Sequence, residues 1–129
     1  MDFTTLFYIV LLLAVILLVY KRMAPAKNVR TLRADQFKEE LRTSAKNAML
    51  IDVREPGEFK SGHIPGAVNI PLSQLGSRTD DIPKDRIVYL YCKSGMRSQQ
   101  AGRVLSSRGY ANLAHLQGGI SAWDGQVKR

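Results

Sequence analysis

The sequence contains very little cysteine and histidine. Its 129 residues include one cysteine, Cys92, and two histidines, His63 and His115. A single cysteine excludes an intramolecular disulfide, and it excludes a zinc or iron–sulfur site that needs several thiolates. Two histidines argue against a metal site built from several imidazoles. We therefore expect no bound metal.

Acidic residues are also few. There are 11 Asp and Glu residues against 19 Lys and Arg residues, a net charge of +8, and no acidic residue occurs between Asp2 and Asp35. This excess indicates an anionic partner, such as a membrane surface, a nucleic acid or a small anion. The content of 45% hydrophobic and 23% charged residues is typical of globular proteins and excludes a disordered chain.

The hydrophobic residues are concentrated near the amino terminus. The 18 residues from Phe3 to Tyr20 contain no charged side chain. As a helix they would rise roughly 27 Å, close to the roughly 30 Å hydrocarbon core of a bilayer. The run is apolar on all sides, so it lacks the polar face of a surface helix. We predict a single transmembrane helix at about residues 3–20, within a segment 1–22 that includes its basic flank.

The apolar run has two other possible interpretations, a cleaved signal peptide and a buried core helix. A cleaved signal peptide has a basic segment before its apolar region, whereas this chain begins Met1-Asp2. The sequence at 24–26 resembles a small-x-small cleavage site, but Lys21 and Arg22 lie between it and the apolar run. A buried core helix would be shorter and more amphipathic. A retained anchor is therefore the favoured interpretation.

Basic residues predict the orientation of this anchor. Five of them follow the apolar run and none precedes it: Lys21, Arg22, Lys27, Arg30 and Arg33. The positive-inside rule then predicts a single-pass protein of the cell membrane, with its amino terminus outside and its carboxyl-terminal part in the cytoplasm. These cations can also contact anionic headgroups. No interleaving of aromatic and basic residues indicates nucleic-acid binding, so we expect none.

The rest of the chain predicts one α/β domain at residues 29–129, after a linker at 23–28. Short apolar runs that predict strands alternate with stretches that predict helices, which favours a parallel sheet flanked by helices. In such sheets, ligands bind beyond the carboxyl ends of the strands. The predicted strands are 29–32, 48–53, 67–70, 86–91 and 112–116, and the predicted helices are 34–44, 55–61, 73–76, 98–108 and 120–127.

The loop after the strand predicted at 86–91 contains the candidate catalytic residue. It runs from Cys92 to Ser98 with the sequence CKSGMRS. Gly95 permits a tight turn that aims backbone N–H groups inward, and the following helix adds the positive end of its dipole. Lys93 and Arg97 add two cations. Such a loop binds an anion and stabilises a thiolate, which is a nucleophile without a histidine base. The alternative is that Cys92 is a small apolar residue that ends a strand.

Three segments in order resemble the rhodanese-domain family. They are DVREPGEF at 52–59, GHIPGAVNIP at 62–71 and the CKSGMRS loop, followed by a closing pattern of Gly118, Gly119 and Trp123. The similarity covers about residues 29–126 and excludes the apolar segment. It implies a rhodanese fold, a five-stranded parallel sheet flanked by helices, here preceded by one transmembrane helix.

The resemblance also implies a reaction. Cys92 would carry sulfane sulfur as a persulfide, from a small anionic donor such as thiosulfate to cyanide or to the thiol of a small molecule or protein, without a cofactor. The loop from Lys93 through Ser94, Gly95 and Met96 to Arg97 would hold the donor. Asp52, Arg54 and Ser98 would support the loop, or Asp52 and Arg54 would pair with each other or with Glu58. Direct donor contact by Arg54 is the alternative. His63 would stabilise a turn, and His115 has no evident partner.

Two other functions share this fold. One is a non-catalytic rhodanese-like module that binds or senses at the membrane. The other, less favoured, is a cysteine-loop phosphatase or arsenate reductase. In this chain Cys92 and Arg97 are separated by four residues, whereas phosphatases with such loops have five. A shorter loop suits one sulfur atom on the cysteine and crowds a tetrahedral phosphate. The leading prediction is therefore sulfur transfer.

Overall fold

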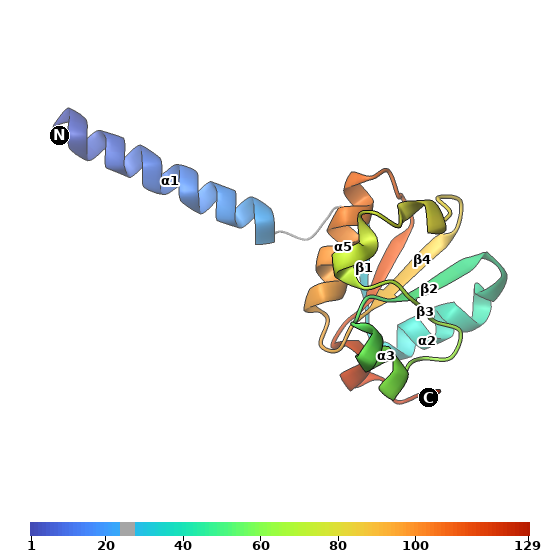
Figure 1. Cartoon of the computed structure of the whole chain (residues 1–129). Coiled ribbons are helices and arrows are strands. Elements are labelled where there is room, and N and C mark those ends of the chain that lie inside the picture. Colours follow the sequence, from blue (N-terminus) through green and yellow to red (C-terminus); the bar gives the residue numbers. More distant parts are fainter. Residues whose placement is uncertain (24–27) are drawn as a thin grey trace.

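The computed structural model describes residues 1–23 and 28–129, so most of the predicted linker at 23–28 lies outside the described residues. The amino-terminal helix, α1 (Phe3–Met23), extends three residues beyond the predicted span (Figure 1). All its residues are exposed. Among the described residues, α1 is the one helix long and apolar enough to cross a membrane, and its length and composition also fit a signal sequence.

Five parallel strands form the sheet, as predicted. Their order is β1-β5-β4-β2-β3, so β4 lies at the centre. Parallel strands at the centre of such a sheet are covered on both faces, which explains the continuous apolar sequence of β4. The strands are β1 (Val29–Leu32), β2 (Ala48–Asp52), β3 (Val68–Asn69), β4 (Ile87–Tyr91) and β5 (Leu113–Leu116).

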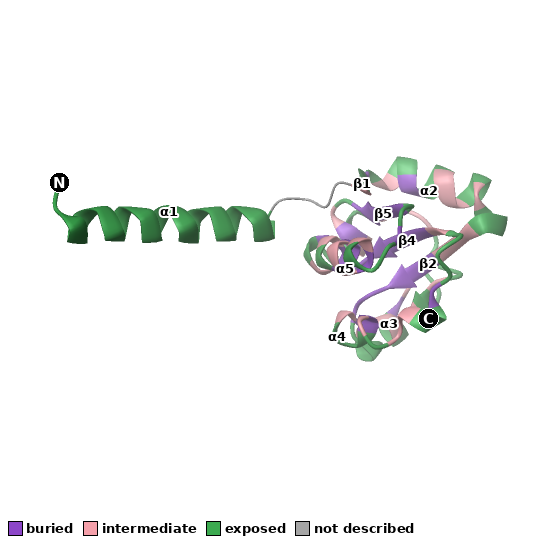
Figure 2. Ribbon diagram, turned by 90° about the horizontal axis from the view of Figure 1, so that it is seen from above, coloured by how far each residue is buried: buried purple, intermediate pink, exposed green. Residues whose placement is uncertain are grey.

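Helices cover both faces of the sheet, and the strands between them are the most buried part of the domain (Figure 2). One face packs against α4 and α5, and the other packs against α2 and the carboxyl-terminal segment. The four helices are α2 (Ala34–Thr43), α3 (Pro56–Ser61), α4 (Leu72–Leu75) and α5 (Met96–Ser107), and three single 3-10 turns are η1 (Ala45–Asn47), η2 (Thr79–Asp81) and η3 (Gly119–Ala122).

The alternation of side chains along β4 decides which face carries the cysteine. Val88 and Leu90 pack in the cluster beneath α5, and Cys92, the next residue of the same parity, belongs to that cluster. Tyr89 and Tyr91 point to the opposite face, toward α2. Successive side chains of a strand point to opposite faces, so the sequence of β4 alone aims Cys92 at α5.

The structure corrects several predicted boundaries. The helix predicted at 98–108 begins at Met96, because Gly95 adopts a left-handed conformation with φ of 106° and starts the helix there. The strand predicted at 67–70 pairs only at Val68–Asn69. The strand predicted at 29–32 has its predicted bounds, and the helix predicted at 73–76 lies at 72–75. The other strands and helices, apart from the carboxyl-terminal one, differ by one residue at one end.

The helix predicted at 120–127 is wrong. Only the 3-10 turn η3 forms there, and it ends at Ala122. The Trp123 indole N–H donates to the Gln126 carbonyl at 3.0 Å, and this contact bends the chain back. Lys128 then forms an antiparallel bridge with His63. Tertiary pairing of the carboxyl-terminal segment therefore replaces the amphipathic helix that its sequence pattern predicted.

Candidate active site

The candidate nucleophile, Cys92, follows the central strand at the carboxyl edge of the sheet. Cys92 comes directly after β4, and α5 begins four residues later at Met96. Cys92 is only 1% exposed. The edge of a parallel sheet beyond the strand ends is where α/β proteins bind ligands, so the fold places the cysteine as predicted from the sequence.

Two groups contact the Cys92 sulfur. The Gly95 N–H donates to Sγ at 3.0 Å, and the Cys92 thiol donates to Ser98 Oγ at 3.6 Å. The left-handed conformation of Gly95 turns its N–H back toward the sulfur, a conformation that other residues rarely adopt. The amino terminus of the 12-residue helix α5 adds a positive dipole end beside the sulfur. These features stabilise negative charge on Sγ.

The turn η3 holds the backbone of the loop. The Ile120 N–H donates to the Cys92 carbonyl at 2.8 Å, and the Ser121 N–H donates to the Lys93 carbonyl at 3.1 Å. In a planar trans peptide the C=O and the following N–H point in opposite directions. The N–H groups of Lys93 and Ser94 therefore point away from η3, so η3 orients the amides of the loop.

The turn η3 can approach the loop closely because Gly119 has no side chain. A Cβ on Gly119 would lie 2.4 Å from the Lys93 carbonyl and 2.5 Å from the Cys92 oxygen, and its φ is 61°. Both the space and the backbone conformation therefore require glycine. The sequence showed Gly119 as part of a pattern shared with the rhodanese-domain family but did not reveal this contact with the cysteine loop.

The mouth of the loop is polar and partly paired. Lys93, Ser94 and Met96 are exposed, and Met96 is 80% exposed. The half-buried guanidinium of Arg97 donates to both oxygens of the Glu58 carboxylate, at 2.7 and 3.0 Å. This hydrogen-bonded pair raises the pKa of Arg97 and lowers the pKa of Glu58 to about 2. Arg97 therefore stays charged beside the loop, anchored to α3.

Asp52 and Arg54 lie on the other face of the sheet. Asp52 has the parity of Leu50, which packs on the α2 face, opposite to Cys92. The Asp52 carboxylate accepts from the backbone and side chain of Arg54, with Oδ2 to Nη2 at 2.8 Å. Arg54 Nη2 also donates to the Gly62 carbonyl at 2.7 Å. The contacts of this buried pair join β2 to the end of α3.

A polar line that the sequence did not reveal runs beneath the loop. Ser98 Oγ lies 3.1 Å from His115 Nδ1, and His115 Nε2 lies 3.0 Å from Thr31 Oγ1. The expectation that His115 has no partner is therefore wrong. Burial lowers the pKa of His115, which keeps its imidazole neutral near pH 7. Thr31 and His115 are register partners in β1 and β5, 84 residues apart in sequence.

His63 stabilises local structure, as the sequence suggested. Its Nδ1 lies 2.9 Å from the Phe59 carbonyl, and its ring stacks on Phe59. Within residues 1–23 and 28–129, no group of three or more His, Cys, Asp or Glu side chains could hold a metal ion.

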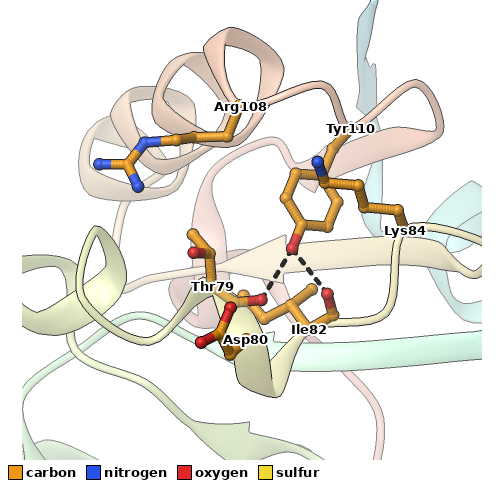
Figure 3. A pocket seen from close by; sticks show the side chains of 6 residues that line it. All are labelled: Thr79, Asp80, Ile82, Lys84, Arg108 and Tyr110. Carbon is orange, nitrogen blue, oxygen red and sulfur yellow. Dashed lines mark hydrogen bonds between the residues drawn. The ribbon is translucent and has the colours of Figure 1, made fainter.

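A separate pocket lies at the opposite end of the sheet (Figure 3). The Tyr110 hydroxyl on its wall donates to the carbonyls of Thr79 and Ile82. Ile82 and Lys84 precede β4, whereas Cys92 follows it, so this pocket is distinct from the cysteine loop. Its lining residues are Thr79, Asp80, Ile82, Lys84, Arg108 and Tyr110.

Comparison with known proteins identifies the class that this fold and loop define. The model of the rhodanese-like domain family matches residues 33–126, most of the chain. The chain therefore belongs to the rhodanese-like family, with the predicted rhodanese fold. The predicted domain bounds of 29–129 are slightly wider than this match and stay a prediction.

Relatives of this chain include named sulfurtransferases. An uncharacterized protein of Bacillus subtilis (strain 168), YqhL, is 49% identical over 90 residues, which cover 70% of this chain and 71% of that protein. A thiosulfate:glutathione sulfurtransferase of Saccharomyces cerevisiae is 33% identical over 116 residues, covering 76% and 82%. The crystal structure of a Thermoplasma volcanium rhodanese-related protein matches with a TM-score of 0.68 at 30% identity, covering 77% and 97%. These similarities support sulfur transfer in general.

Proposed function

We propose that this protein is a membrane-anchored sulfurtransferase that carries sulfane sulfur as a persulfide on Cys92. One observation carries the proposal. The sulfur of the sole cysteine lies at the end of the central strand and accepts the Gly95 N–H at 3.0 Å, within a loop oriented by η3. This arrangement suits a sulfur atom that bears negative charge, both as a thiolate and as a persulfide.

The reaction has two halves. The Cys92 thiolate attacks the outer sulfur of thiosulfate, a new S–S bond forms at Sγ, and the S–S bond of thiosulfate breaks. Sulfite leaves with the electron pair of that bond. Cyanide or a thiolate then attacks the outer sulfur of the persulfide, and the electrons of the Sγ–S bond return to Cys92. Sulfite is a good leaving group, so no general acid is needed.

The charges at the mouth suit an anionic donor. The exposed ammonium of Lys93 and the charged guanidinium of Arg97 flank the loop, and we assign the sulfite end of the donor to them. The N–H groups of Lys93, Ser94 and Gly95 would hold the outer sulfur. The activity in the name of the yeast relative supports thiosulfate as donor and a small thiol as acceptor.

The length of the loop favours sulfur over phosphate. Four residues separate Cys92 from Arg97, which leaves less room for a tetrahedral phosphate than the five-residue spacing of phosphatase loops. A phosphatase or arsenate reductase is therefore the weaker candidate.

We assign this chemistry to a membrane. The helix α1 has the length and apolarity of a single span, and its last turn carries the basic residues Lys21 and Arg22. We assign the amino terminus to the outside and the domain to the cytoplasm, where a lone thiol stays reduced.

Mass spectrometry of the full chain in detergent tests the proposal. After thiosulfate treatment, Cys92 gains the mass of one sulfur atom, and cyanide removes it and yields thiocyanate. Cys92→Ser, a small change at the same site, gains no sulfur and has no thiosulfate:cyanide activity. A wild-type protein that takes up no sulfur supports the non-catalytic module. Aryl-phosphate hydrolysis that depends on Cys92, without a persulfide, supports the phosphatase.

A further inference from the structure

Four side chains form a continuous hydrogen-bonded line from the reactive sulfur to the surface. Cys92 Sγ contacts Ser98 Oγ at 3.6 Å, Ser98 Oγ contacts His115 Nδ1 at 3.1 Å, and His115 Nε2 contacts Thr31 Oγ1 at 3.0 Å. Cys92, Ser98 and His115 are buried, at 1%, 0% and 6% exposure, whereas Thr31 is exposed. The line therefore links a buried thiol to solvent.

The fold builds this line from neighbouring elements. Along the sheet, β5 lies between β4 and β1, and His115 has Leu90 and Thr31 as its register partners. Ser98 reaches His115 from the first turns of α5. Both nitrogens of a neutral imidazole are thereby bonded, one as donor and one as acceptor. Packing alone would not require a hydroxyl on each side of the ring.

We propose that Ser98, His115 and Thr31 form a proton path that removes the Cys92 proton and then holds the thiolate. This deepens the sulfurtransferase proposal, because it rests on Cys92 as the nucleophile. Ser98 contacts the reacting sulfur directly. His115 and Thr31 act on that sulfur through Ser98 and are positioning residues for the thiolate.

The proton balance leaves the imidazole neutral throughout. The Ser98 hydroxyl, which also donates to the Gly95 carbonyl at 3.2 Å, first turns to His115 Nδ1. The thiol proton then moves to Ser98 Oγ as the Ser98 proton moves to His115 Nδ1. The proton on His115 Nε2 passes to Thr31 Oγ1, and the Thr31 proton leaves to water. Afterwards the Ser98 hydroxyl donates to the Cys92 thiolate, Nδ1–H donates to Ser98, and Nε2 accepts from Thr31. Because no imidazolium forms, the burial of His115 favours the path instead of opposing it.

Other charges around the sulfur are fixed by pairs. Arg97 on α5 pairs with Glu58 on α3, and on β2 the carboxylate of Asp52 pairs with Arg54. Lys93 in the loop is exposed. Leu90 and Thr31, which flank His115 on the neighbouring strands, do not titrate. A change in the pH profile of Cys92 caused by His115 variants therefore reports on this line.

Alkylation of Cys92 by iodoacetamide, measured against pH in the full chain, tests the path. This rate follows the thiolate and needs no sulfur donor. We expect Ser98→Ala to slow alkylation about tenfold at pH 7, with recovery at alkaline pH, because a hydrogen bond to a charged sulfur is lost. His115→Phe slows it roughly fivefold. His115→Asn, which keeps a polar group near Nδ1, restores most of the rate, and Thr31→Val slows it less than His115→Phe.

Controls separate the path from a structural role. His63→Phe and Thr43→Val change the same residue types away from the line and leave the alkylation profile unchanged. Thermal unfolding identifies any variant that has not folded. Thr31→Val changes an exposed residue, so we expect this variant to fold even if the substitutions of buried residues do not. Wild-type alkylation profiles in folded Ser98→Ala and His115→Phe overturn the path. Altered profiles without persulfide formation in the wild type keep the path and overturn sulfur transfer.

Discussion

At the scale of single residues, the buried ion pair of Asp52 and Arg54 has a structural role. Asp52 is 0% exposed, and its carboxylate accepts three bonds from the Arg54 side chain besides one from its backbone. The Asn69 side chain stabilises the same region, because it donates to the backbone carbonyls of Asp52 and Arg54. Removing one partner of such a pair leaves an uncompensated buried charge.

Asp52→Asn should therefore destabilise the domain strongly. We expect the free energy of unfolding to fall by roughly 3–5 kcal/mol, measured by denaturant titration. The matched control is Glu39→Gln, which breaks an exposed ion pair with Arg42 and should leave the free energy of unfolding nearly unchanged. Equal effects of the two substitutions would contradict the structural role.

The pairing of Glu58 with Arg97 predicts a pH dependence of stability. The pKa of Glu58 falls from 4.5 to about 2 in the folded protein, chiefly because it accepts hydrogen bonds from Arg97. A depressed carboxyl pKa stabilises the fold fully above about pH 4.5, and this contribution is lost as the pH falls toward about 2. Glu58→Gln should flatten the stability curve between these values, measured by thermal unfolding. Parallel curves for Glu58→Gln and wild type would refute it.

At the scale of elements, the short turn η3 holds the cysteine loop. Gly119→Ala places a Cβ 2.4 Å from the Lys93 backbone, at a positive φ. We expect this variant to lose at least tenfold in Cys92 alkylation rate and more than about 2 kcal/mol of stability, because η3 must move away. Gly57→Ala is the matched control, since nothing lies within 4 Å of its added Cβ. It should be neutral or slightly stabilising. A wild-type alkylation rate and wild-type stability in Gly119→Ala would contradict the role of η3 in holding the loop.

Local pattern was enough to predict most elements and the cysteine loop. The apolar runs of β2 and β4, and Gly95 before α5, act within a few residues, so the sequence reveals them. The polar line could not be predicted, because it depends on the strand order that brings Thr31 beside His115. The missed end of the chain has the same cause, since Lys128 pairs with His63 across the fold.

At the scale of the whole molecule, the proposed topology is directly testable. With α1 as an anchor that leaves the domain in the cytoplasm, a phosphatase reporter fused after Arg129 should be inactive, because this reporter is active only outside the cytoplasm. A fluorescent reporter that folds only in the cytoplasm should be bright at the same position. Weakening the charge bias by Lys21→Glu and Arg22→Glu is expected to lower that brightness. An active phosphatase fusion would reverse the assigned orientation.

The polarity of the sheet sets where the sulfur can be delivered. Five Cα-to-Cα steps lead from Met23 of α1 to Asn28, whose side chain donates to the Tyr110 carbonyl at the amino edge of the strands. That edge can therefore lie at most about 18 Å from the end of α1. Cys92 lies at the other edge, beyond the five residues of β4, or about 17 Å. The connection to α1 is thus attached at the edge of the sheet opposite to Cys92. We therefore expect a sulfur acceptor to reach Cys92 from water, on the side of the domain opposite to this attachment.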